Sequence, residues 1–556
     1  RPAPAGALQE GERQRRVVRA YFDNRQMVAA AAAWVAPWDV NVEEGYLVAE
    51  VGDVEATALE AIGFRLEVDA ERTRRLIRPN VRLPGQTSGI PGYPCYRTVE
   101  ETHATGAQLA QDYPGLATWT DVGDSWEKAN VPGTGYDLFV LRLTNRSVAG
   151  PKPKLFVMSS VHAREYTPAE MNTRFAEYLV ENYGAHPDVT WLLDYHEVHL
   201  LLQANPDGRK QAEAGAYWRK NTNQAYCGTD SPFRGADLNR NYPFQWGCCG
   251  GSSSYQCSEL YRGAAPASEP ETQAVRDYVR TEFADRRQEP LTAAAPVTTT
   301  GIFLDLHSYG GDVLWPWGFT DAVAPNGMAL QTLGRKLAYF NDYMPRQAIE
   351  LYPTDGTTDD FAYGDLGLAA YAFEIGTRFF ESCGAFEDIV YPDNLPALVY
   401  AAKAAQAPYQ IPAGPDALAV TVSPAQVTAG ERATLTVRLD DGRFSNRNGV
   451  EPVQALAAAA YHVGPRPWVT ETAILAGSML PADGTFDQSV EWATVTVDTS
   501  SLWPGRHLIY VRGRDTDGNW GAASAAFLEV APAPGTWRDA FFPVLQREGG
   551  IGRRTQ

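Results

Sequence analysis

Long hydrophobic runs are missing from this chain of 556 residues. The longest candidate, MVAAAAAWVAPW at 27–38, is too short to cross a bilayer and contains Pro37. Basic charge is also scarce, because 48 Lys and Arg stand against 67 Asp and Glu, and the formal net charge is −19. A nucleic-acid-binding protein normally carries a basic face. We therefore expect neither membrane insertion nor nucleic-acid binding.

Cysteine is uncommon too, and its spacing excludes one class of site. None of the six cysteines forms a C-x-x-C pair, which argues against a structural zinc site. Disulfides in an exported protein are the better interpretation, although six cysteines allow fifteen pairings. The chain begins with Arg1 rather than Met, so we expect a secreted protein whose export signal has been removed. The cysteines are Cys95, Cys227, Cys248, Cys249, Cys257 and Cys383.

Three regions differ in their patterns of hydrophobic residues. The first mixes short strand and helix patterns, the second alternates strands with helices as α/β domains do, and the third has only short strands with turn signals. Pro- and Gly-rich stretches separate them. The predicted division is an α+β domain at 1–80, a linker at 81–94, an α/β domain at 95–408, a linker at 409–417, an immunoglobulin-like β-sandwich at 418–532 and a tail at 533–556.

The segment VHAREYTPAE follows an apolar, β-prone run and precedes a helical pattern. Thr167 is a plausible N-cap, with Pro168 at the first helical position and Glu170 completing a capping box. His162 and Glu165 would then lie on a strand-to-helix turn, where α/β folds place reactive groups. The pair suggests two metal ligands, although an isolated H-x-x-E is more often an ordinary surface turn.

A zinc site needs a third protein ligand, and a catalytic site leaves one position open for water. His307 is the strongest candidate, because it ends the strand-like run GIFLDLH. His196 and His199 in HEVH are spaced so that a strand would place them on opposite faces, and they cannot share one ion. We interpret those two as structural.

Charged residues in apolar surroundings mark the rest of the candidate site. Glu374 lies in the apolar strand LAAYAFEIG, where a carboxylate is costly unless it is paired or functional. Asn239 and Arg240 are adjacent in DLNRN, and an amide beside a planar guanidinium suits the binding of a carboxylate. Arg219 stands in YWRKN.

Taken together, these motifs resemble the zinc metallocarboxypeptidases of the carboxypeptidase A, B and T type. They occur in the family's order over about 300 residues, and WGCCGGSSS is similar to bacterial carboxypeptidase T. The resemblance implies a mixed eight-stranded sheet flanked by helices and one Zn²⁺ per chain, and it does not cover the C-terminal region. The matching motifs are HARE, NPDG, WRKN, DLNRN, YRG with SEPET, HSYG, LYPTDGTTDDFAYG and AFEIG.

The resemblance also implies a role for each matching residue. Three are zinc ligands, one acid orients the first histidine, one acid is the general base, and one arginine stabilises the developing oxyanion. Four further residues bind the terminal carboxylate of a peptide or protein, which would restrict the enzyme to chain ends. The implied zinc ligands are His162, Glu165 and His307, the orienting acid is Asp237, the general base is Glu374 and the oxyanion arginine is Arg219. The implied carboxylate-binding residues are Asn239, Arg240 and Tyr352, with Arg164 as an auxiliary.

Specificity depends on the pocket for the terminal side chain. Asp359 falls where the basic-specific carboxypeptidase B branch carries its selecting aspartate, although Asp360 is adjacent and the alignment could slip by one residue. Leu314, Leu351 and Ala372 suggest otherwise apolar walls. The sequence therefore predicts a preference for C-terminal Lys and Arg, or a dual preference for basic and hydrophobic residues.

The N-terminal unit resembles, in position and pattern, the inhibitory pro-segments of this family. It would cover the active site until the arginine-rich stretch within 71–94 is cut; a permanent accessory domain is the alternative. We expect a zymogen that acts as a monomer. Two other functions stay open from the sequence: a zinc amidase or deacylase of the same fold acting on amino-acid conjugates or cell-wall peptides, and a non-catalytic surface-binding protein.

Overall fold

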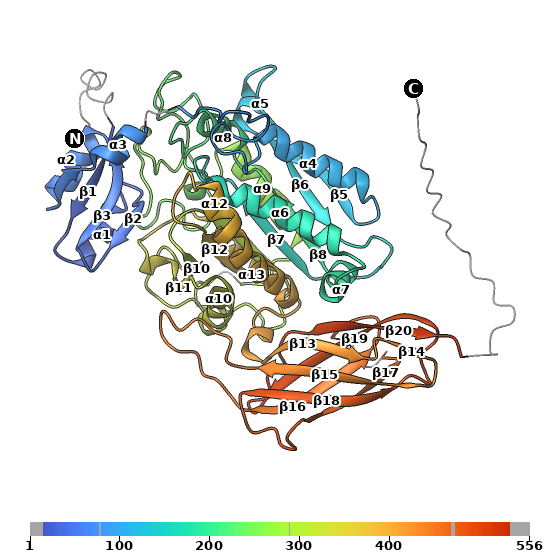
Figure 1. The fold of residues 1–556 in the computed structure, drawn as a ribbon. Coiled ribbons are helices and arrows are strands. Elements are labelled where there is room, and N and C mark those ends of the chain that lie inside the picture. Colours follow the sequence, from blue (N-terminus) through green and yellow to red (C-terminus); the bar gives the residue numbers. More distant parts are fainter. Residues whose placement is uncertain (1–14, 77–78, 289, 469–472, 534–556) are drawn as a thin grey trace, which may run out of the picture.

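The computed structural model describes residues 15–76, 79–288, 290–468 and 473–533. Figure 1 shows a small blue unit at the N-terminus, a large central unit of sheet and helices, and an orange-to-red unit of strands at the C-terminus. No helix within those ranges is long and apolar enough to span a membrane.

The central unit is built on a mixed eight-stranded sheet in the order β11-β10-β12-β9-β7-β8-β6-β5. The middle strands β8, β7, β9 and β12 run parallel, and they are nearly all apolar because helices cover both faces. This sheet confirms the predicted fold class. Its strands are β5 (Ala117–Asp124), β6 (Asp137–Leu143), β7 (Lys154–Ser159), β8 (Glu197–Leu201), β9 (Ile302–His307), β10 (Asp312–Trp315), β11 (Met344–Gln347) and β12 (Ala369–Glu374).

Helices α6 and α13 pack on the buried strands β7 and β9, while α11 packs on β9 and β12. The helices of this unit are α4 (Val99–Asp112), α5 (Trp126–Asn130), α6 (Tyr166–Asn182), α7 (Pro187–Tyr195), α8 (Pro206–Glu213), α9 (Pro270–Glu282), α10 (Gly327–Asn341), α11 (Thr358–Leu366), α12 (Cys383–Ala385) and α13 (Tyr391–Ala404).

The first turn of α6 begins earlier than the capping pattern predicts. Glu165 is the N-cap, rather than Thr167, and its side chain makes no capping hydrogen bond. The carboxylate of Glu170 instead accepts hydrogen bonds from the backbone N and Nη1 of Arg97. The predicted capping box is therefore wrong. Glu170 forms an ion pair with Arg97 instead of capping the helix, and the carboxylate of Glu165 faces His162.

The N-terminal unit is a four-stranded antiparallel sheet in the order β2-β3-β1-β4 with three helices. Its elements are β1 (Arg16–Tyr21), α1 (Arg25–Ala31), β2 (Asp39–Asn41), β3 (Tyr46–Val51), α2 (Asp53–Ala61), β4 (Arg65–Val68) and α3 (Ala70–Leu76). After it the chain is largely exposed from Pro79 to Ser88, and then Ile90 enters the core of the central unit.

The C-terminal unit contains eight strands in the order β13-β15-β18-β17-β16-β19-β20-β14, with buried and exposed residues alternating as in a sandwich. Apart from Ala533, the predicted tail lies outside the described residues. The strands are β13 (Asp416–Ser423), β14 (Gln426–Thr428), β15 (Arg432–Asp440), β16 (Leu456–Val463), β17 (Leu475–Pro481), β18 (Val490–Asp498), β19 (Gly505–Asp515) and β20 (Ser524–Ala531).

The sandwich shares a hydrophobic core with the central unit. Tyr510 and Ala525 join the core of the large sheet, and Lys403 on α13 forms an ion pair with Asp188 on α7, which also accepts a hydrogen bond from the backbone N of Ala525. The segment predicted as the second linker contains the buried Tyr409. The junction is thus packed rather than extended.

Three disulfides account for all six cysteines, as expected for an exported protein: Cys95–Cys383, Cys227–Cys257 and the adjacent pair Cys248–Cys249.

Candidate zinc centre and substrate cavity

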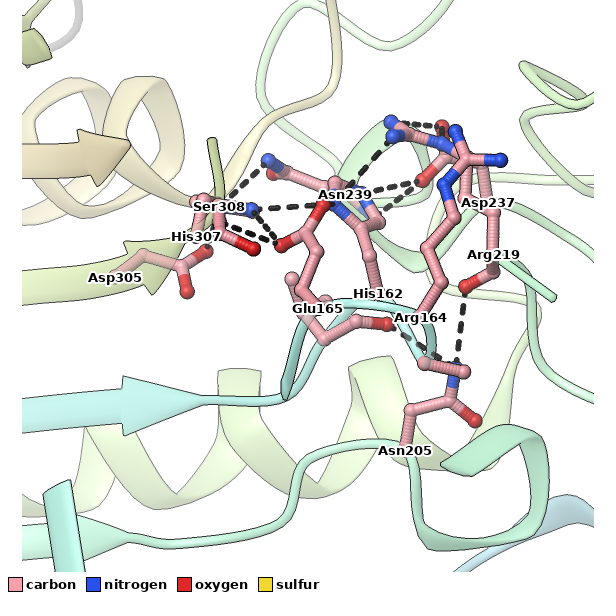
Figure 2. A network of polar contacts seen from close by, with 12 residues as sticks. His162, Arg164, Glu165, Asn205, Arg219, Asp237, Asn239, Asp305, His307 and Ser308 are labelled. Carbon is pink, nitrogen blue, oxygen red and sulfur yellow. Dashed lines mark hydrogen bonds and ion pairs between the residues drawn. The ribbon is translucent and has the colours of Figure 1, made fainter. Parts of the chain in front are cut away.

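Three candidate metal ligands converge at the carboxyl ends of neighbouring strands (Figure 2). His162 and Glu165 lie on the turn between β7 and α6, and His307 is the last residue of β9, the parallel neighbour of β7. His162 Nδ1 lies 2.7 Å from Glu165 Oε1 and 3.1 Å from His307 Nδ1, which lies 3.3 Å from Glu165 Oε2. All three side chains are buried.

The far side of each imidazole fixes its tautomer. His162 Nε2 lies 3.2 Å from Asp237 Oδ1, and His307 Nε2 lies 2.9 Å from Asp305 Oδ2. A carboxylate accepts a hydrogen bond from each Nε2–H, so both Nδ1 lone pairs face each other and Glu165. A positive charge, supplied by a bound cation or by a proton on His307, satisfies that arrangement. A tetrahedral ion with bonds of about 2.0–2.1 Å places its ligand atoms about 3.3 Å apart, which fits zinc.

The charge balance agrees with a cation at this point. Burial raises the pKa of Glu165, but His162 and His307 lower it to well below its ordinary value. Burial lowers the pKa of His307, but Asp305 and Glu165 raise it to well above its ordinary value. The site therefore favours a positive charge between its ligands.

Asp237 joins the first histidine to Arg219. Its Oδ2 accepts hydrogen bonds from Nε and Nη2 of Arg219 at 3.0 and 2.9 Å, while Oδ1 faces His162. Burial alone would raise the pKa of Asp237, but Arg219 and His162 lower it by more than burial raises it. The net pKa lies well below its ordinary value, so this carboxyl group is ionised. Nη1 of Arg219 remains turned to the metal side, 3.4 Å from His162 Nδ1.

Asn205 of the NPDG motif holds two of these segments together. Its Nδ2 donates to the carbonyl oxygens of Val161 and Lys220 at 3.1 and 3.0 Å, and its Oδ1 accepts from the backbone N of Gly208. The turn carrying His162 and the segment carrying Arg219 are thus fixed to one side chain.

Glu374 ends β12 and is paired in register with His307 on the parallel strand β9. It is partly buried and lines a cavity of about 360 Å³ together with His162, Glu165 and His307. Burial raises the pKa of Glu374 to about 8, with the nearby His307 opposing the shift and Glu165 adding to it.

Asn239 and Arg240 reach the same cavity from the short helix η2 (Leu238–Arg240), capped by Asp237. Asn239 Oδ1 accepts a hydrogen bond from the backbone N of Thr358 at 2.9 Å. Arg240 donates through Nε to Gly251 O and through Nη1 to Asn239 O. Among the described residues its Nη2 has no partner, so this nitrogen is free for a ligand.

The structure separates the two adjacent aspartates that the sequence left ambiguous. Asp359 lines the cavity with Leu314, Leu351 and Ala372, whereas Asp360 accepts hydrogen bonds from the backbone N of Gly318. Burial raises the pKa of Asp359.

Arg164 borders the cavity but is engaged elsewhere. It donates through Nη1 to Glu259 Oε1 at 2.7 Å and lies 3.8 Å from Glu50 of the N-terminal unit. Its guanidinium also faces the ring of Phe379 at 4.3 Å.

The N-terminal unit borders the same cavity. Residues 36–40 lie in its wall, and Trp38 stacks on Tyr217 at 5.7 Å and meets Phe379 edge-on at 5.3 Å. Tyr352 lines the cavity and packs against the hydrophobic core of the N-terminal unit.

Comparison with known proteins gives a family match over residues 102–385, to the model described as zinc carboxypeptidase. The chain belongs to the zinc carboxypeptidase family. The family predicted from the sequence motifs is therefore confirmed, as is the prediction of a zinc-dependent hydrolase at the level of the family.

Curated zinc carboxypeptidases are similar over about half of this chain. The zinc carboxypeptidase of Saccharothrix mutabilis subsp. capreolus is 33% identical over 51% of this chain and 62% of its own length. Carboxypeptidase B of Astacus astacus is 30% identical over 51% of this chain and 86% of its own. Carboxypeptidase B of Bos taurus is 28% identical over 56% of this chain and 70% of its own.

Two solved structures share the carboxypeptidase fold. Carboxypeptidase A from Helicoverpa armigera matches with a TM-score of 0.56 at 21% identity, over 71% of this chain and 98% of its own. Thrombin activatable fibrinolysis inhibitor matches with a TM-score of 0.53 at 22% identity, over 71% of this chain and 99% of its own.

Several residues of this carboxypeptidase site were not predicted. Asp305 and Glu259 support His307 and Arg164, and Asp312 and Arg346 form an ion pair of 2.7 Å in the cavity wall. Asp305 could have been predicted from the sequence, because it is an acid two residues before His307 on an apolar strand. The other three could not, because their roles depend on contacts between distant segments.

A second group of possible ligand atoms includes a histidine interpreted as structural. Glu197, His199 and Glu282 lie close together, but Lys154 Nζ is 2.6 Å from Glu282 and Tyr278 Oη is 2.6 Å from His199 Nδ1. The ammonium group already supplies the positive charge, so this cluster agrees with a structural role.

Proposed function

We propose that this chain is a secreted zinc metallocarboxypeptidase that hydrolyses the C-terminal peptide bond of peptides and proteins, with a preference for terminal Lys and Arg or for basic and hydrophobic residues alike. The observation that carries the proposal is one shared cavity. The candidate metal ligands His162, Glu165 and His307 line this cavity. So do Asp359 and the pair Asn239 and Arg240, which we call the carboxylate clamp.

The metal would be held by His162 Nδ1, His307 Nδ1 and the carboxylate of Glu165. When bound, zinc supplies a Lewis acid that lowers the pKa of water toward about 7 and polarises a carbonyl group. Asp237 and Asp305 keep both imidazoles in the ligating tautomer from their far sides.

Glu374 is the base in this proposal. Its carboxylate takes a proton from water and passes it to the nitrogen of the leaving amino acid, a transfer that needs the ionised form at the start. Arg219 stabilises the negative charge that develops on the carbonyl oxygen, because Asp237 holds its guanidinium with Nη1 facing the site.

The clamp explains cleavage at chain ends. Asn239 and the free Nη2 of Arg240 bind the terminal carboxylate, with Tyr352 beside them. An internal peptide bond offers no carboxylate there and would leave the buried arginine unpaired, which costs binding energy.

Terminal-residue release from peptides ending in Lys, Arg, Leu and Phe, with and without a chelator, tests the activity. We expect chelator-sensitive release. Asp359→Ala should lower kcat/KM for terminal Lys by about 30-fold or more, since truncating one partner of a buried charge pair costs about 2–5 kcal/mol, while terminal Leu is spared. Asp360→Asn is the matched control, because that side chain lies outside the cavity.

Two results would contradict the proposal. The absence of chelator-sensitive release from every peptide would remove the carboxypeptidase assignment and favour an amidase or a binding protein. An equal loss on Lys and Leu peptides in Asp359→Ala would remove only the specificity assignment.

A further inference from the structure

A second cavity lies where the sandwich meets the central unit, on the side of α7 and α13. Its volume is about 450 Å³, a size typical of small-molecule sites. Aromatic side chains form much of its wall: Trp191 and Tyr409 from the central unit, and Trp468 and Trp520 from the sandwich.

The charges around this cavity are opposite to those of the whole protein. The chain carries a net charge of −19, yet among the described residues those that line the cavity include Arg512 and Lys403 and no Asp or Glu. Lys403 is neutralised by Asp188 at 2.6 Å. Within the part of the chain that the structure describes, Arg512 is the lining charge without a carboxylate partner.

Arg512 has an incomplete set of partners. Nε donates to Gly521 O at 3.0 Å and Nη2 to Trp520 O at 3.3 Å, and within the described ranges no carboxylate contacts it. Burial lowers the pKa of Arg512 to about 10. A guanidinium has five N–H donors, and Arg512 is only partly exposed, so a carboxylate partner would stabilise it.

We propose that this cavity is a binding site for a small organic anion, in which Arg512 binds a carboxylate and the rings of Trp468 and Trp520 contact an aromatic or apolar body. The carboxylate supplies the missing counter-charge, and the rings remove the rest of the ligand from water. The site is separate from the zinc centre, since the two cavities share no lining residue.

Calorimetric titration with phenylacetate and with its neutral analogue phenylacetamide tests the proposal. We expect phenylacetate to bind at least about tenfold more tightly than the amide, and Arg512→Gln to weaken phenylacetate binding by about 10–100-fold, because a hydrogen-bonded charge contributes about 1.5–3 kcal/mol. Arg506→Gln is the control on the same strand, where the arginine is exposed and paired with Glu529.

Arg240→Gln separates this site from the peptide cavity, and it should leave phenylacetate binding at the second cavity intact. Hydrogen exchange on the wild-type chain gives a measurement that does not depend on the folding of a variant. Phenylacetate, and not phenylacetamide, should slow exchange in residues 505–523. Equal affinity for acid and amide, unchanged binding in Arg512→Gln, or unchanged exchange in that segment would overturn the proposal.

Discussion

Single residues in the zinc centre depend on partners at their far side. His162 and His307 each present Nδ1 to the centre because Nε2 faces Asp237 or Asp305. The two supports differ in origin, since Asp305 shares strand β9 with its histidine and Asp237 comes from a distant loop. A strand places residues i and i+2 on one face, which brings Asp305 next to His307.

Removing this support should weaken zinc binding without removing a ligand. Asp305→Ala leaves His307 without the acceptor that fixes its tautomer, so we expect zinc affinity to fall by about 10–100-fold. Competition with a chromogenic chelator measures it. Asp321→Asn, an exposed loop substitution, is the control. Unchanged affinity in Asp305→Ala would show that Asp305 does not orient the histidine.

At the scale of elements, the site follows from strand order. β7, β9 and β12 are neighbours and parallel, so the residues at and just after their carboxyl ends meet: the turn with His162 and Glu165, then His307, then Glu374. Helix α6 begins at Tyr166 with Glu165 as its N-cap residue, and because the Glu165 side chain makes no capping hydrogen bond, its carboxylate faces His162 and His307.

Helix α9 carries a buried carboxyl group, Glu271, whose ionisation should change the stability of the fold. Glu271 in its first turn accepts hydrogen bonds from Trp126 N and Asn221 Nδ2, and burial, aided by Glu269, raises its pKa to about 8 from 4.5. Between these values the folded chain holds a proton that the unfolded chain has released. Stability contributed by this group is complete below about pH 4.5 and is lost as pH rises through about 8.

Melting temperatures of wild type and Glu271→Gln from pH 5.5 to 8.5 check this expectation. The variant has no carboxyl group to ionise, so its melting temperature should rise relative to wild type as pH increases. The full difference corresponds to about 5 kcal/mol. Glu181→Gln, on an exposed position of α6, should keep a constant offset. A constant offset for Glu271→Gln as well would contradict the raised pKa.

At the scale of the whole molecule, the N-terminal unit borders the cavity and the sandwich extends the core. Glu50 and Trp38 of the small unit contact Arg164 and Phe379, which places that unit against the cavity that contains the candidate metal ligands. Arg74 and Arg75 at the end of α3 and Arg82 in the connecting segment are exposed, as a trypsin-like protease requires.

Cleavage in this segment should release activity. We expect limited trypsin digestion within residues 71–94 to raise kcat/KM for a C-terminal Lys peptide by at least about tenfold, because the terminal carboxylate then reaches its clamp. A variant with all five arginines of this window, Arg72, Arg74, Arg75, Arg78 and Arg82, replaced by Gln is the uncleaved control. Equal activity before and after cleavage would identify the unit as a permanent accessory domain.

The sandwich should contribute to stability through buried charges at its junction. Arg335 on α10 pairs with Glu451 of the sandwich at 2.6 Å, with side-chain exposures of 8% and 9%. Glu451→Gln leaves a buried cation unpaired, which costs about 3–5 kcal/mol and lowers the melting temperature by several degrees. Asp342→Asn breaks an exposed junction pair and should change little. Equal losses in melting temperature for Glu451→Gln and Asp342→Asn would contradict a stabilising role of the buried pair.

Most of the zinc site was predictable because its residues stand in short motifs at strand ends. His162, Glu165, His307 and Glu374 each follow or end an apolar run, and such runs indicate buried strands whatever the order of the sheet. The start of α6 was not predictable, because Arg97, about seventy residues away, takes Glu170 from the capping box.

The sequence alone determined the family, and it predicted a three-part division into α+β, α/β and all-β patterns and a candidate set of metal ligands. Tertiary structure decided the rest: that Asp359 and not Asp360 lines the cavity, that Arg164 is paired with Glu259, and that the sandwich is packed onto the central core. The reason is physical. Local patterns report burial and periodicity, whereas an ion pair or a cavity wall depends on which distant segments meet.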